Sequence, residues 1–290
     1  MSPIFRWFAM RIARTIPEVR AYLRSHRLSE RTIGLVPTMG AFHEGHLTLM
    51  RRARADEDIV VVSLFVNPIQ FNASSDFETY PRDFDRDALL AQEQGVDLVF
   101  APPAEEMYPA GFASSVRISG LTDTLCGAYR PGHFDGVTTV CSKLFCIIQP
   151  DRAYFGEKDY QQVQVVRRMV ADLSMPIVIT GVPTVREADG LAMSSRNQLL
   201  TPKQRAAAPG LYRALQAGAE AVRSGADGPT AEATVAQHLA AVQGFEPQYV
   251  SAVDPETLQP ATWGGPPMVL ALAGFFGNVR LIDNVGVEVS

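Results

Sequence analysis

Residues 33–46 read Ile-Gly-Leu-Val-Pro-Thr-Met-Gly-Ala-Phe-His-Glu-Gly-His, and this stretch decides the fold. Its first four residues, 33–36, are apolar and predict a buried strand, which ends at a turn containing proline and glycine. A helix is predicted from His43 to about Ala55, and the apolar run from Asp58 to Val66 then predicts a second parallel strand. Strand, helix and strand in this order form one βαβ unit.

The alternation of apolar runs with segments of helical periodicity continues through roughly the first 180 residues. This pattern is typical of a parallel sheet with helices on both faces, so we predict a Rossmann-like α/β domain. The best-defined helix is predicted from Asp135 to Ile148, where apolar residues recur at helical spacing. The remaining helices are predicted over 83–94 and 160–173, and the remaining strands over 96–100, 152–155 and 177–182.

The composition and periodicity of the sequence change from about Thr184 onward, where a polar loop precedes alanine-rich segments and further apolar runs. We therefore expect two domains, a Rossmann-like domain over 1–182 and a smaller α+β domain over 183–290. The second domain is predicted to contain helices near 204–224 and 230–242, and strands near 248–253 and 268–273.

Composition narrows the class of protein. The net charge is −5 and there is no basic run, so binding to a nucleic-acid backbone has little electrostatic support. The three cysteines lack Cys-x-x-Cys spacing, which argues against a zinc site and favours a reducing cytoplasm. No segment is apolar over the roughly 20 residues that a membrane helix needs. The first nine or so residues, where arginines interrupt an apolar run, are interpreted as a short extension.

Two histidines lie at the predicted junction between the first strand and its helix. In open α/β sheets ligands bind beyond the carboxyl ends of strands, and free N–H groups at a helix start favour phosphate. His43 and His46 lie on the same side of a first helical turn, while Gly40 and Gly45 let a nucleotide approach the backbone. A lone histidine is more often a capping or packing residue, but a pair that flanks a glycine at this junction favours a triphosphate site.

Two later segments carry groups suited to the same ligand. Lys158 lies between Gly156 and Gln162 at a predicted strand-to-helix junction, although a lysine at a helix start is more often a solvated surface charge. Within the polar segment 186–197, residues 193–196 read Met-Ser-Ser-Arg and offer two hydroxyl groups and a guanidinium to phosphate oxygens. The alternative for this segment is an ordinary linker between the domains.

The motifs resemble those of a known superfamily. The His-x-Gly-His pattern is similar to the signature of the nucleotidyltransferases, and the segment 186–197 resembles their Lys-Met-Ser-Lys-Ser loop. Further stretches, in the right order, resemble the pantothenate synthetase family, and the resemblance spans about Ile16 to the C-terminus. These stretches are 63–71, 130–137, 156–162, 193–196 and 281–284.

The resemblance implies condensation of pantoate with β-alanine at the expense of ATP, through a pantoyl adenylate, with release of pyrophosphate and AMP. It also implies catalytic roles for His46 as the proton donor and for His43, Lys158 and Arg196 at the phosphates. The implied ATP-binding residues are Met39, Gly40, His43, Gly45, His46, Gly156, Glu157, Lys158, Asp159, Val185, Met193, Ser194, Ser195 and Arg196.

The resemblance also places the second substrate. Gln70 and Gln162 match the residues that hold pantoate. Met39 and Asn67 are expected to bind substrate beside them, although a structural role is equally expected for Asn67. An amide both donates and accepts hydrogen bonds, which suits a ligand with hydroxyl and carboxylate groups. The segment 130–137 adds two further candidates, for which structural roles are equally expected. They are Arg130 and His133.

Magnesium accompanies the nucleotide in this family. Asp87 is the one ligand carried over, because the family typically has two adjacent acids where this chain has Arg86 and Asp87. Asp83 and Asp85 lie at the same predicted helix start. Their presence is equally well explained as that of acids favoured by the helix dipole.

The resemblance further implies a homodimer, with the active site in the cleft between the two domains and the 193–196 loop as its lid. A rival enzymatic interpretation is an adenylyltransferase that stops at a nucleotide product. A non-catalytic interpretation is a nucleotide-sensing interaction module, which would bind ATP without releasing pyrophosphate.

Overall fold

The computed structural model describes residues 10–72, 77–78 and 80–288, so the predicted N-terminal extension lies outside the described residues. The chain forms two compact units, each assembled from three segments. The second unit takes in two segments from before residue 183, and the ranges 1–182 and 183–290 stay a prediction. We call them the parallel-sheet unit, over Met1–Val116, Asp135–Phe155 and Val170–Val182, and the antiparallel-sheet unit, over Arg117–Phe134, Gly156–Met169 and Pro183–Ser290.

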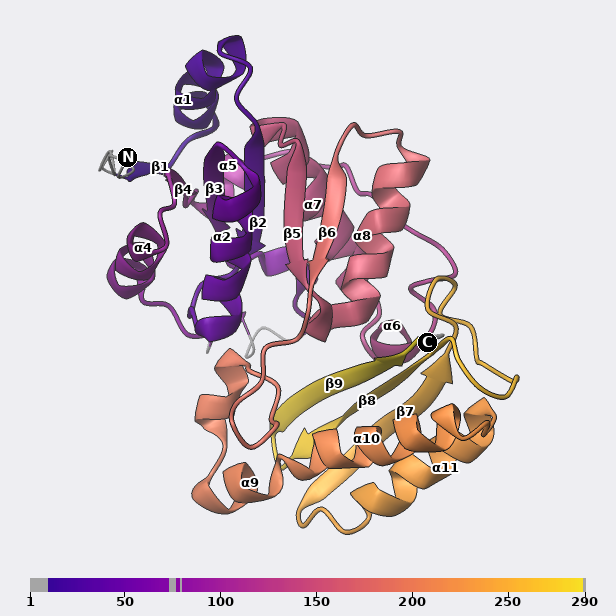
Figure 1. Cartoon of the computed structure of the whole chain (residues 1–290). Coiled ribbons are helices and arrows are strands. Elements are labelled where there is room, and N and C mark those ends of the chain that lie inside the picture. Colours follow the sequence, from indigo (N-terminus) through magenta and orange to yellow (C-terminus); the bar gives the residue numbers. More distant parts are fainter. Residues whose placement is uncertain (1–9, 73–76, 79, 289–290) are drawn as a thin grey trace, which may run out of the picture. The chain divides into compact units, whose positions relative to one another are not determined.

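The parallel-sheet unit contains a six-stranded sheet in the order β1-β4-β3-β2-β5-β6 (Figure 1). The pairs β1–β4, β4–β3, β3–β2 and β2–β5 are parallel, which confirms the predicted Rossmann-like α/β class. The strand order reverses at β2 and β5, because β3 and β4 lie on one side of β2 and β5 and β6 on the other. The strands span Arg11–Ala13 (β1), Ile33–Thr38 (β2), Ile59–Leu64 (β3), Leu98–Phe100 (β4), Arg152–Gly156 (β5) and Val178–Val182 (β6).

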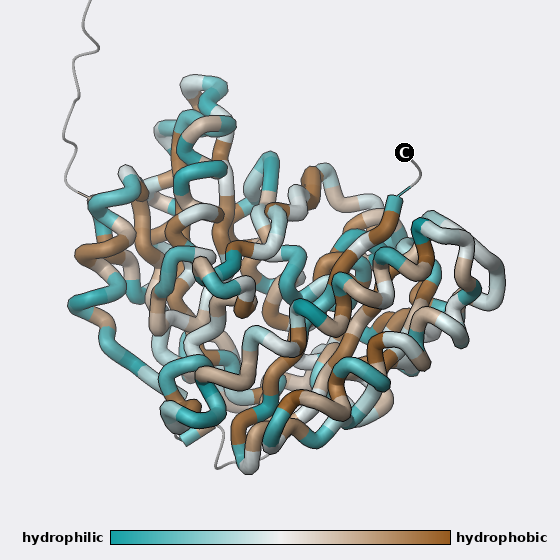
Figure 2. Tube along the Cα trace, turned by 60° about the horizontal axis from the view of Figure 1, so that its bottom comes forward, coloured by the Kyte–Doolittle hydropathy of each residue, from teal (hydrophilic) through white to brown (hydrophobic). Residues whose placement is uncertain are grey.

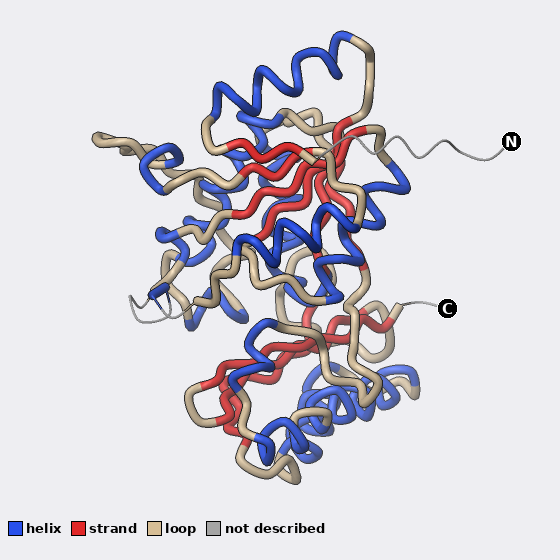
Figure 3. The backbone as a smooth tube through the Cα atoms, turned by 90° about the vertical axis from the view of Figure 1, so that its left-hand side faces the viewer, coloured by secondary structure: helices blue, strands red, loops and turns tan. Residues whose placement is uncertain are grey.

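Helices lie on both sides of the parallel strands (Figure 3). The hydrophobic residues of β2, β3 and β4 are largely buried. Hydrophobic and hydrophilic stretches alternate along the chain (Figure 2). Within the described ranges, no helix combines the length and the apolar character that crossing a lipid bilayer demands. The helices that begin before residue 183 span Ile16–Leu28 (α1), Glu44–Asp56 (α2), Phe84–Glu93 (α4), Ala104–Met107 (α5), Leu125–Tyr129 (α6), His133–Ile148 (α7) and Tyr160–Asp172 (α8).

The helix α2 forms where the sequence predicted it, because its apolar residues recur on one face. Leu49, Met50 and Ala53 are buried in the same hydrophobic cluster as Val36 of β2 and Val62 of β3. Every residue of β3 except the last is buried, as expected for a central parallel strand covered on both faces. Full burial of a valine, leucine, isoleucine or methionine side chain contributes about 1.5–3 kcal/mol to folding.

The sequence prediction missed the strand β1 and the helix α1. The strand is only three residues long, too short for a periodic signal. The helix has a reciprocal cap, in which Glu18 N–H donates to the Thr15 hydroxyl and Thr15 N–H donates to the Glu18 carboxylate. Thr-x-x-Glu is a capping signature that marks a helix start, so α1 was predictable from residues 15–18.

The antiparallel-sheet unit contains a three-stranded sheet in the order β7-β8-β9, in which both pairs are antiparallel. The predicted helix over 204–224 is two helices, because Pro209 lacks the N–H that a continuous helix requires. The strand β9 was not predicted, since its buried and exposed residues do not alternate regularly. The elements span Pro202–Ala207 (α9), Gly210–Arg223 (α10), Gly228–Leu239 (α11), Phe245–Val253 (β7), Met268–Phe276 (β8) and Val279–Val287 (β9).

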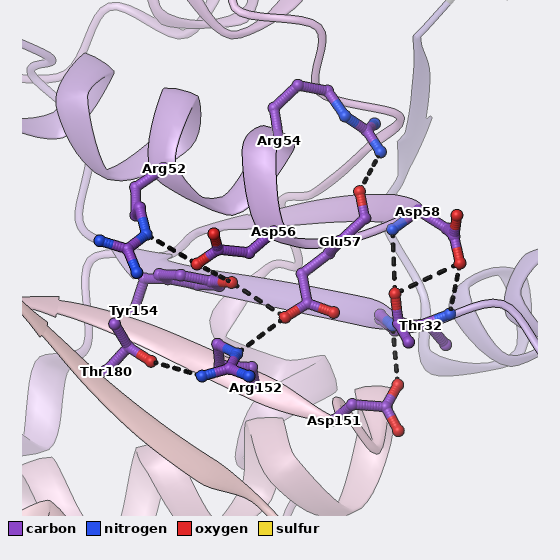
Figure 4. A network of polar contacts seen from close by, with 11 residues as sticks. Thr32, Arg52, Arg54, Asp56, Glu57, Asp58, Asp151, Arg152, Tyr154 and Thr180 are labelled. Carbon is purple, nitrogen blue, oxygen red and sulfur yellow. Dashed lines mark hydrogen bonds and ion pairs between the residues drawn. The ribbon is translucent and has the colours of Figure 1, made fainter.

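A polar network links the carboxyl end of α2 to β5 and β6 in the parallel-sheet unit (Figure 4). The Glu57 carboxylate, at the end of α2, accepts hydrogen bonds from Arg152 Nε and Tyr154 Oη of β5, both at 2.9 Å. Arg152 also donates to the Thr180 hydroxyl of β6 at 3.3 Å. A Cβ on Gly34 of β2 would lie 2.8 Å from the Glu57 side chain, so the network occupies the space beside that glycine. The network stabilises the end of the sheet at which the parallel strands begin, opposite to their carboxyl ends.

Candidate active site

The predicted site residues fall into two groups, one in each unit, and each group is described by itself. In the parallel-sheet unit the chain leaves β2 at Thr38 and enters a loop that ends at the start of α2. Gly40 and Ala41 both lie in the left-handed region, with φ of 89° and 54°. Glycine adopts this conformation readily, whereas for alanine it costs about 1–2 kcal/mol, so other contacts must hold the loop in place.

The carboxylate of Asp87, on α4, supplies these contacts. The backbone N–H groups of Ala41 and Phe42 donate to its two oxygens at 2.7 and 2.8 Å. The Asp87 side chain is buried, and burial raises its pKa above the ordinary value even though the two N–H groups pull it down in part. Asp87 therefore fixes the backbone of the loop that precedes His43.

The structure brings His43 and His46 together, with ring centroids 4.2 Å apart. His43 is the N-cap of α2, and its Nδ1 accepts the Gly45 N–H at 3.1 Å. His46 Nδ1 accepts the His43 N–H at 3.4 Å, which completes a reciprocal cap. A neutral ring whose Nδ1 accepts a hydrogen bond carries its proton on Nε2. Capping therefore uses Nδ1 of each ring, and this role is compatible with the phosphate contact predicted from the sequence.

A Cβ on Gly45 would lie 2.9 Å from Cε1 of His43. Only a residue without a side chain lets the His43 ring fold back over the start of α2 in this way. The glycine between the histidines is therefore needed for the geometry of the pair.

Next to this loop lies a chain of polar contacts that contains three of the predicted substrate residues. Gln70 Nε2 donates to the Met39 sulfur at 2.9 Å, and Asn67 Nδ2 donates to Gln70 Oε1 at 3.0 Å. The Tyr108 hydroxyl donates to Asn67 Oδ1 at 2.7 Å. Asn67 and Gln70 are buried, so each amide is held in one orientation by its partners.

Tyr108 was not predicted from the sequence. It lies just after the short helix α5, and no motif marks a single aromatic residue in such a position. Burial raises the pKa of its hydroxyl well above the ordinary value, so the hydroxyl stays protonated and donates to Asn67. Only its spatial neighbours indicate its role.

The first turn of α7 packs directly against the 3₁₀ turn that carries Gln70, η1 (Pro68–Gln70). A Cβ on Gly136 would lie 2.5 Å from the Ile69 carbonyl oxygen and 2.6 Å from the Gln70 Cα. The Gly136 carbonyl accepts a hydrogen bond from Asn67 Nδ2 at 3.1 Å. The glycine at this position thus sets the location of the Gln70 backbone.

In the antiparallel-sheet unit, Lys158 lies in a 3₁₀ turn, η2 (Glu157–Asp159), which directly follows β5. The Lys158 side chain is mostly buried, and its Nζ lies 3.9 Å from the Asp159 carboxylate. It lines a small cavity together with Ser194, Asn197 and Asp283. A Cβ on Gly156 would meet no atom within 4 Å, so the backbone at the end of β5 is open to a ligand.

The polar segment 186–197 forms a hairpin-like loop in the same unit. Met193 N–H donates to the Val185 carbonyl at 2.9 Å, and Arg186 and Ala192 form an isolated bridge. The Ser194 hydroxyl accepts the Arg196 N–H at 3.2 Å, at the start of a 3₁₀ turn, η3 (Ser195–Leu199). The backbone of Val185 and the 193–196 segment are therefore neighbours, as the predicted nucleotide site requires.

The remaining candidates lie in this unit as well. Arg130 contacts Nε2 of His133 at 3.0 Å, and burial lowers the pKa of its guanidinium to about 10, with the positive charge of Arg280 adding to the effect. Gln162 is half-buried on α8. Its neighbour Gln161 is buried and serves the fold, because it accepts the Cys126 N–H and donates to two backbone carbonyls.

The residues proposed for magnesium do not fit a metal site in the described part of the chain. Both oxygens of Asp87 accept backbone N–H groups, and its side chain is buried. The Asp83 carboxylate caps α4 by accepting the Arg86 N–H at 3.1 Å, and Asp85 is exposed in its first turn. Across residues 10–72, 77–78 and 80–288, no three histidine, cysteine or acidic side chains cluster so as to hold a metal ion.

Comparison with known proteins shows one family over nearly the whole chain. Residues 11–286 match the family model described as pantoate-beta-alanine ligase. The pantothenate synthetase of Moorella thermoacetica is 53% identical over 282 residues, which cover 97% of this chain and 100% of that protein. The pantothenate synthetase of Thermus thermophilus is 53% identical over 282 residues, which cover 96% of this chain and 99% of that protein.

Solved structures show the same similarity in three dimensions. The crystal structure of pantothenate synthetase from Thermus thermophilus matches with a TM-score of 0.91 at 51% identity, covering 97% of this chain and 100% of the other. The crystal structure of pantoate-beta-alanine ligase from Francisella tularensis, complexed with beta-gamma ATP and beta-alanine, matches with a TM-score of 0.81 at 34% identity. It covers 97% of this chain and 99% of the other.

Proposed function

The chain belongs to the pantoate-beta-alanine ligase family, and from this premise we propose how its residues carry out the reaction. The family predicted from the motifs is confirmed. The protein condenses pantoate with β-alanine to form pantothenate at the expense of ATP. The pantoate carboxylate attacks the α-phosphorus of ATP and pyrophosphate leaves. The β-alanine amine then attacks the acyl carbon of pantoyl adenylate, so that the amide forms, AMP leaves and the amine gives up a proton.

The observation that carries the residue assignment is the histidine pair at the end of β2. The two rings lie 4.2 Å apart, and each Nδ1 accepts a backbone N–H, which assigns the proton of each ring to Nε2. We assign these Nε2–H groups to phosphate oxygens of ATP, with His46 as the proton donor and His43 as a phosphate contact. Donors fixed before the reaction stabilise the charge that develops on phosphate oxygens during adenylyl transfer.

The topology of the sheet supports a nucleotide site at this end of the strands. The strands β2 and β5 are parallel neighbours at the point where the strand order reverses, and ligands of open α/β sheets bind at such a point. The loop that follows β2 carries both histidines, and the turn that follows β5 carries Lys158. We assign Lys158, Ser194 and Arg196 to the phosphates, with the backbone of Gly156 and Val185 beside the nucleotide.

We assign pantoate to the group around Gln70. Its amide is held between Asn67 and Met39 and can accept from a hydroxyl or donate to a carboxylate of the substrate. Gln162, half-buried on α8, is the second amide that we assign to pantoate. The proposed role of Gln70 follows the family pattern and its contacts in the parallel-sheet unit, whereas that of Gln162, in the antiparallel-sheet unit, follows the family pattern.

Three properties of the holoenzyme complete the proposal. Magnesium is proposed to enter with the ATP phosphates, because it usually keeps several waters and few protein ligands. A homodimer and a cytoplasmic location are proposed from the family, and the three free cysteines support a reducing compartment. Sedimentation of the purified protein tests the dimer.

The experiment that tests the function measures pyrophosphate release from ATP with and without pantoate, followed by AMP formation on addition of β-alanine. We expect pyrophosphate release to depend on pantoate, and AMP formation to depend on the further addition of β-alanine. Pyrophosphate release with a stable nucleotide product would favour the adenylyltransferase interpretation. ATP binding without any pyrophosphate release in the presence of pantoate would overturn catalysis and favour a nucleotide-sensing module.

A further inference from the structure

We propose that Asp283 and Asn284, adjacent on β9, are positioning residues that hold the two nucleotide-binding segments of the antiparallel-sheet unit in place. Asn284 acts through Lys158, and Asp283 acts through Arg186 at the base of the 193–196 loop. The proposal rests on the proposed function, in that it takes Lys158 and this loop as phosphate-binding groups. The reaction itself assigns no role to the 281–284 stretch, although the sequence marks it as a motif.

Asn284 fixes the turn that carries Lys158. Its Nδ2 donates to the carbonyl oxygens of Glu157 and Lys158, both at 2.9 Å. An amide NH₂ has two hydrogens, so one side chain satisfies two consecutive carbonyls of η2. Asn284 is buried, which makes these bonds costly to break, because the carbonyls would then lack partners away from water. The contacts determine where the Lys158 backbone lies and hence where its ammonium group can reach.

Asp283 fixes the base of the loop in the same unit. Its carboxylate accepts two hydrogen bonds from the Arg186 guanidinium, at 2.7 and 2.9 Å. The Arg186 guanidinium also donates to the Gly190 carbonyl at 3.1 Å, and it lies over the Tyr212 ring at 3.6 Å from the centroid. Bidentate pairing sets both the position and the plane of the guanidinium. Arg186 is therefore a structural part of the loop.

The placement of both residues on one strand explains how they act together. Successive side chains of a strand point to opposite faces, so a single step along β9 reaches two different segments. Asp283 and Asn284 pair with Leu272 and Ala271 of β8, both buried in the core of the sheet. The sheet thus provides a rigid support from which Lys158 and the loop are held. The hydrogen-bonding groups described for Asp283 and Asn284 are engaged with protein atoms, which is why we call them positioning residues.

The decisive variant is Asn284→Asp, which keeps the size of the side chain but replaces the donating NH₂ group with an accepting oxygen that faces two carbonyl oxygens. We expect kcat/KM for ATP to fall by about tenfold or more, since about 1.4 kcal/mol corresponds to a factor of ten. The KM for pantoate should change little. Asn278→Asp is the matched control, because Asn278 is exposed in the turn before β9 of the same hairpin. An equal loss for both substrates, or no loss, would overturn the positioning role.

A double-mutant cycle with Lys158→Ala tests whether Asn284 acts through Lys158. If it does, Asn284→Asp has little further effect once Lys158 is removed. Losses that simply multiply would overturn the inference while leaving the proposed function intact. A Lys158→Ala enzyme with unchanged kcat/KM for ATP would instead refute the phosphate role of Lys158, and the inference with it.

A second variant keeps the test available if Asn284→Asp does not fold, as judged by thermal unfolding. Asn284→Ser leaves one donor in place of two, so it is expected to lose part of the ATP kcat/KM that Asn284→Asp loses. The Lys158→Ala background should remove this smaller loss as well. A loss that persists in that background contradicts the positioning role.

Discussion

The carboxylate of Asp87 accepts the backbone N–H of Ala41 at 2.7 Å, although 45 residues lie between them in the chain, and this bond holds Ala41 at a φ of 54°. A strained residue persists only where surrounding contacts determine its conformation. Here the determining group is buried on α4, while the strained residue lies two positions before His43. The geometry of the histidine pair therefore depends on a residue that does not need to touch the substrate.

The Asp87→Asn variant tests this dependence. An amide has one acceptor oxygen, so it can satisfy only one of the two N–H groups and places its own NH₂ against the other. We expect kcat/KM for ATP to fall by about 10²-fold, as displacement of a positioning group by roughly 1 Å does. The magnesium concentration for half-maximal activity should stay the same. A large shift in that concentration would instead support a metal role for Asp87. Asp85→Asn, exposed on the same helix, is the matched control.

The histidines can be separated by substitutions that keep or remove the cap of α2. His46→Ala is expected to reduce pantoate-dependent pyrophosphate release by a factor of about 10²–10³, as loss of one preorganised donor does. His43→Asn keeps an N-cap acceptor but removes Nε2, so stability should be preserved while the KM for ATP rises. His238→Ala, at an exposed site on α11, serves as the control. Unchanged turnover in folded His46→Ala protein would rule out its role as proton donor.

Gly136→Ala is expected to impair the use of pantoate. Alanine is favoured over glycine in a helix by about 1 kcal/mol, yet here its Cβ would meet the Ile69 carbonyl at 2.5 Å and force the η1 turn to move. The KM for pantoate should rise by about tenfold or more, with a smaller change in the KM for ATP. Gly286→Ala is the control, because a Cβ there would meet no atom within 4 Å. Equal effects on both KM values would show that Gln70 has been assigned to the wrong substrate.

Tyr154→Phe should destabilise the protein without changing its kinetics. The Tyr154 hydroxyl is bonded to the Glu57 carboxylate at 2.9 Å inside the network of Figure 4, and hydrogen bonds to charged groups contribute about 1.5–3 kcal/mol. Thermal unfolding should show a midpoint lower by several degrees. Kinetic constants are expected to stay the same, since the network lies at the amino ends of the strands. Tyr22→Phe is a control at a half-buried tyrosine of α1.

Much of the fold could be predicted because local sequence determines it. The apolar runs at Ile33–Thr38 and Ile59–Leu64 and the helix between them follow directly from residue periodicity. The strand β1 gave no such signal, because its three residues become a strand only through pairing with β4, more than eighty positions later. The irregular pattern of β9 likewise makes sense only beside β8, where two of its polar residues reach other segments.

The candidate site likewise contains residues that local sequence identifies and residues whose role depends on distant contacts. His43, His46 and Lys158 were identified because they occupy strand-to-helix junctions, which the sequence pattern alone reveals. The residues that hold such groups come from distant positions: Asp87 for the histidine loop and Asn284 for Lys158. The family resemblance marked Asp87 as a magnesium ligand and Asn284 as part of the 281–284 stretch, but nothing in the sequence shows which segment each of them holds. A single sequence therefore identifies the groups proposed to meet the ligand more readily than those that support them.

The interleaving of the two units has a consequence for synthesis on the ribosome. The segments 117–134 and 156–169 emerge early but belong to a unit whose sheet is completed only by the last strand, β9. The Tyr160 hydroxyl, for example, donates to the carbonyl of Pro255, and this bond cannot form until Pro255 has been synthesised. Cys126 likewise contacts Tyr249 and Arg280, which are made much later than Cys126 itself. A nascent chain that stops at residue 182 thus carries two strips of surface whose partners have not been made. The second unit can close only after β9 has been synthesised.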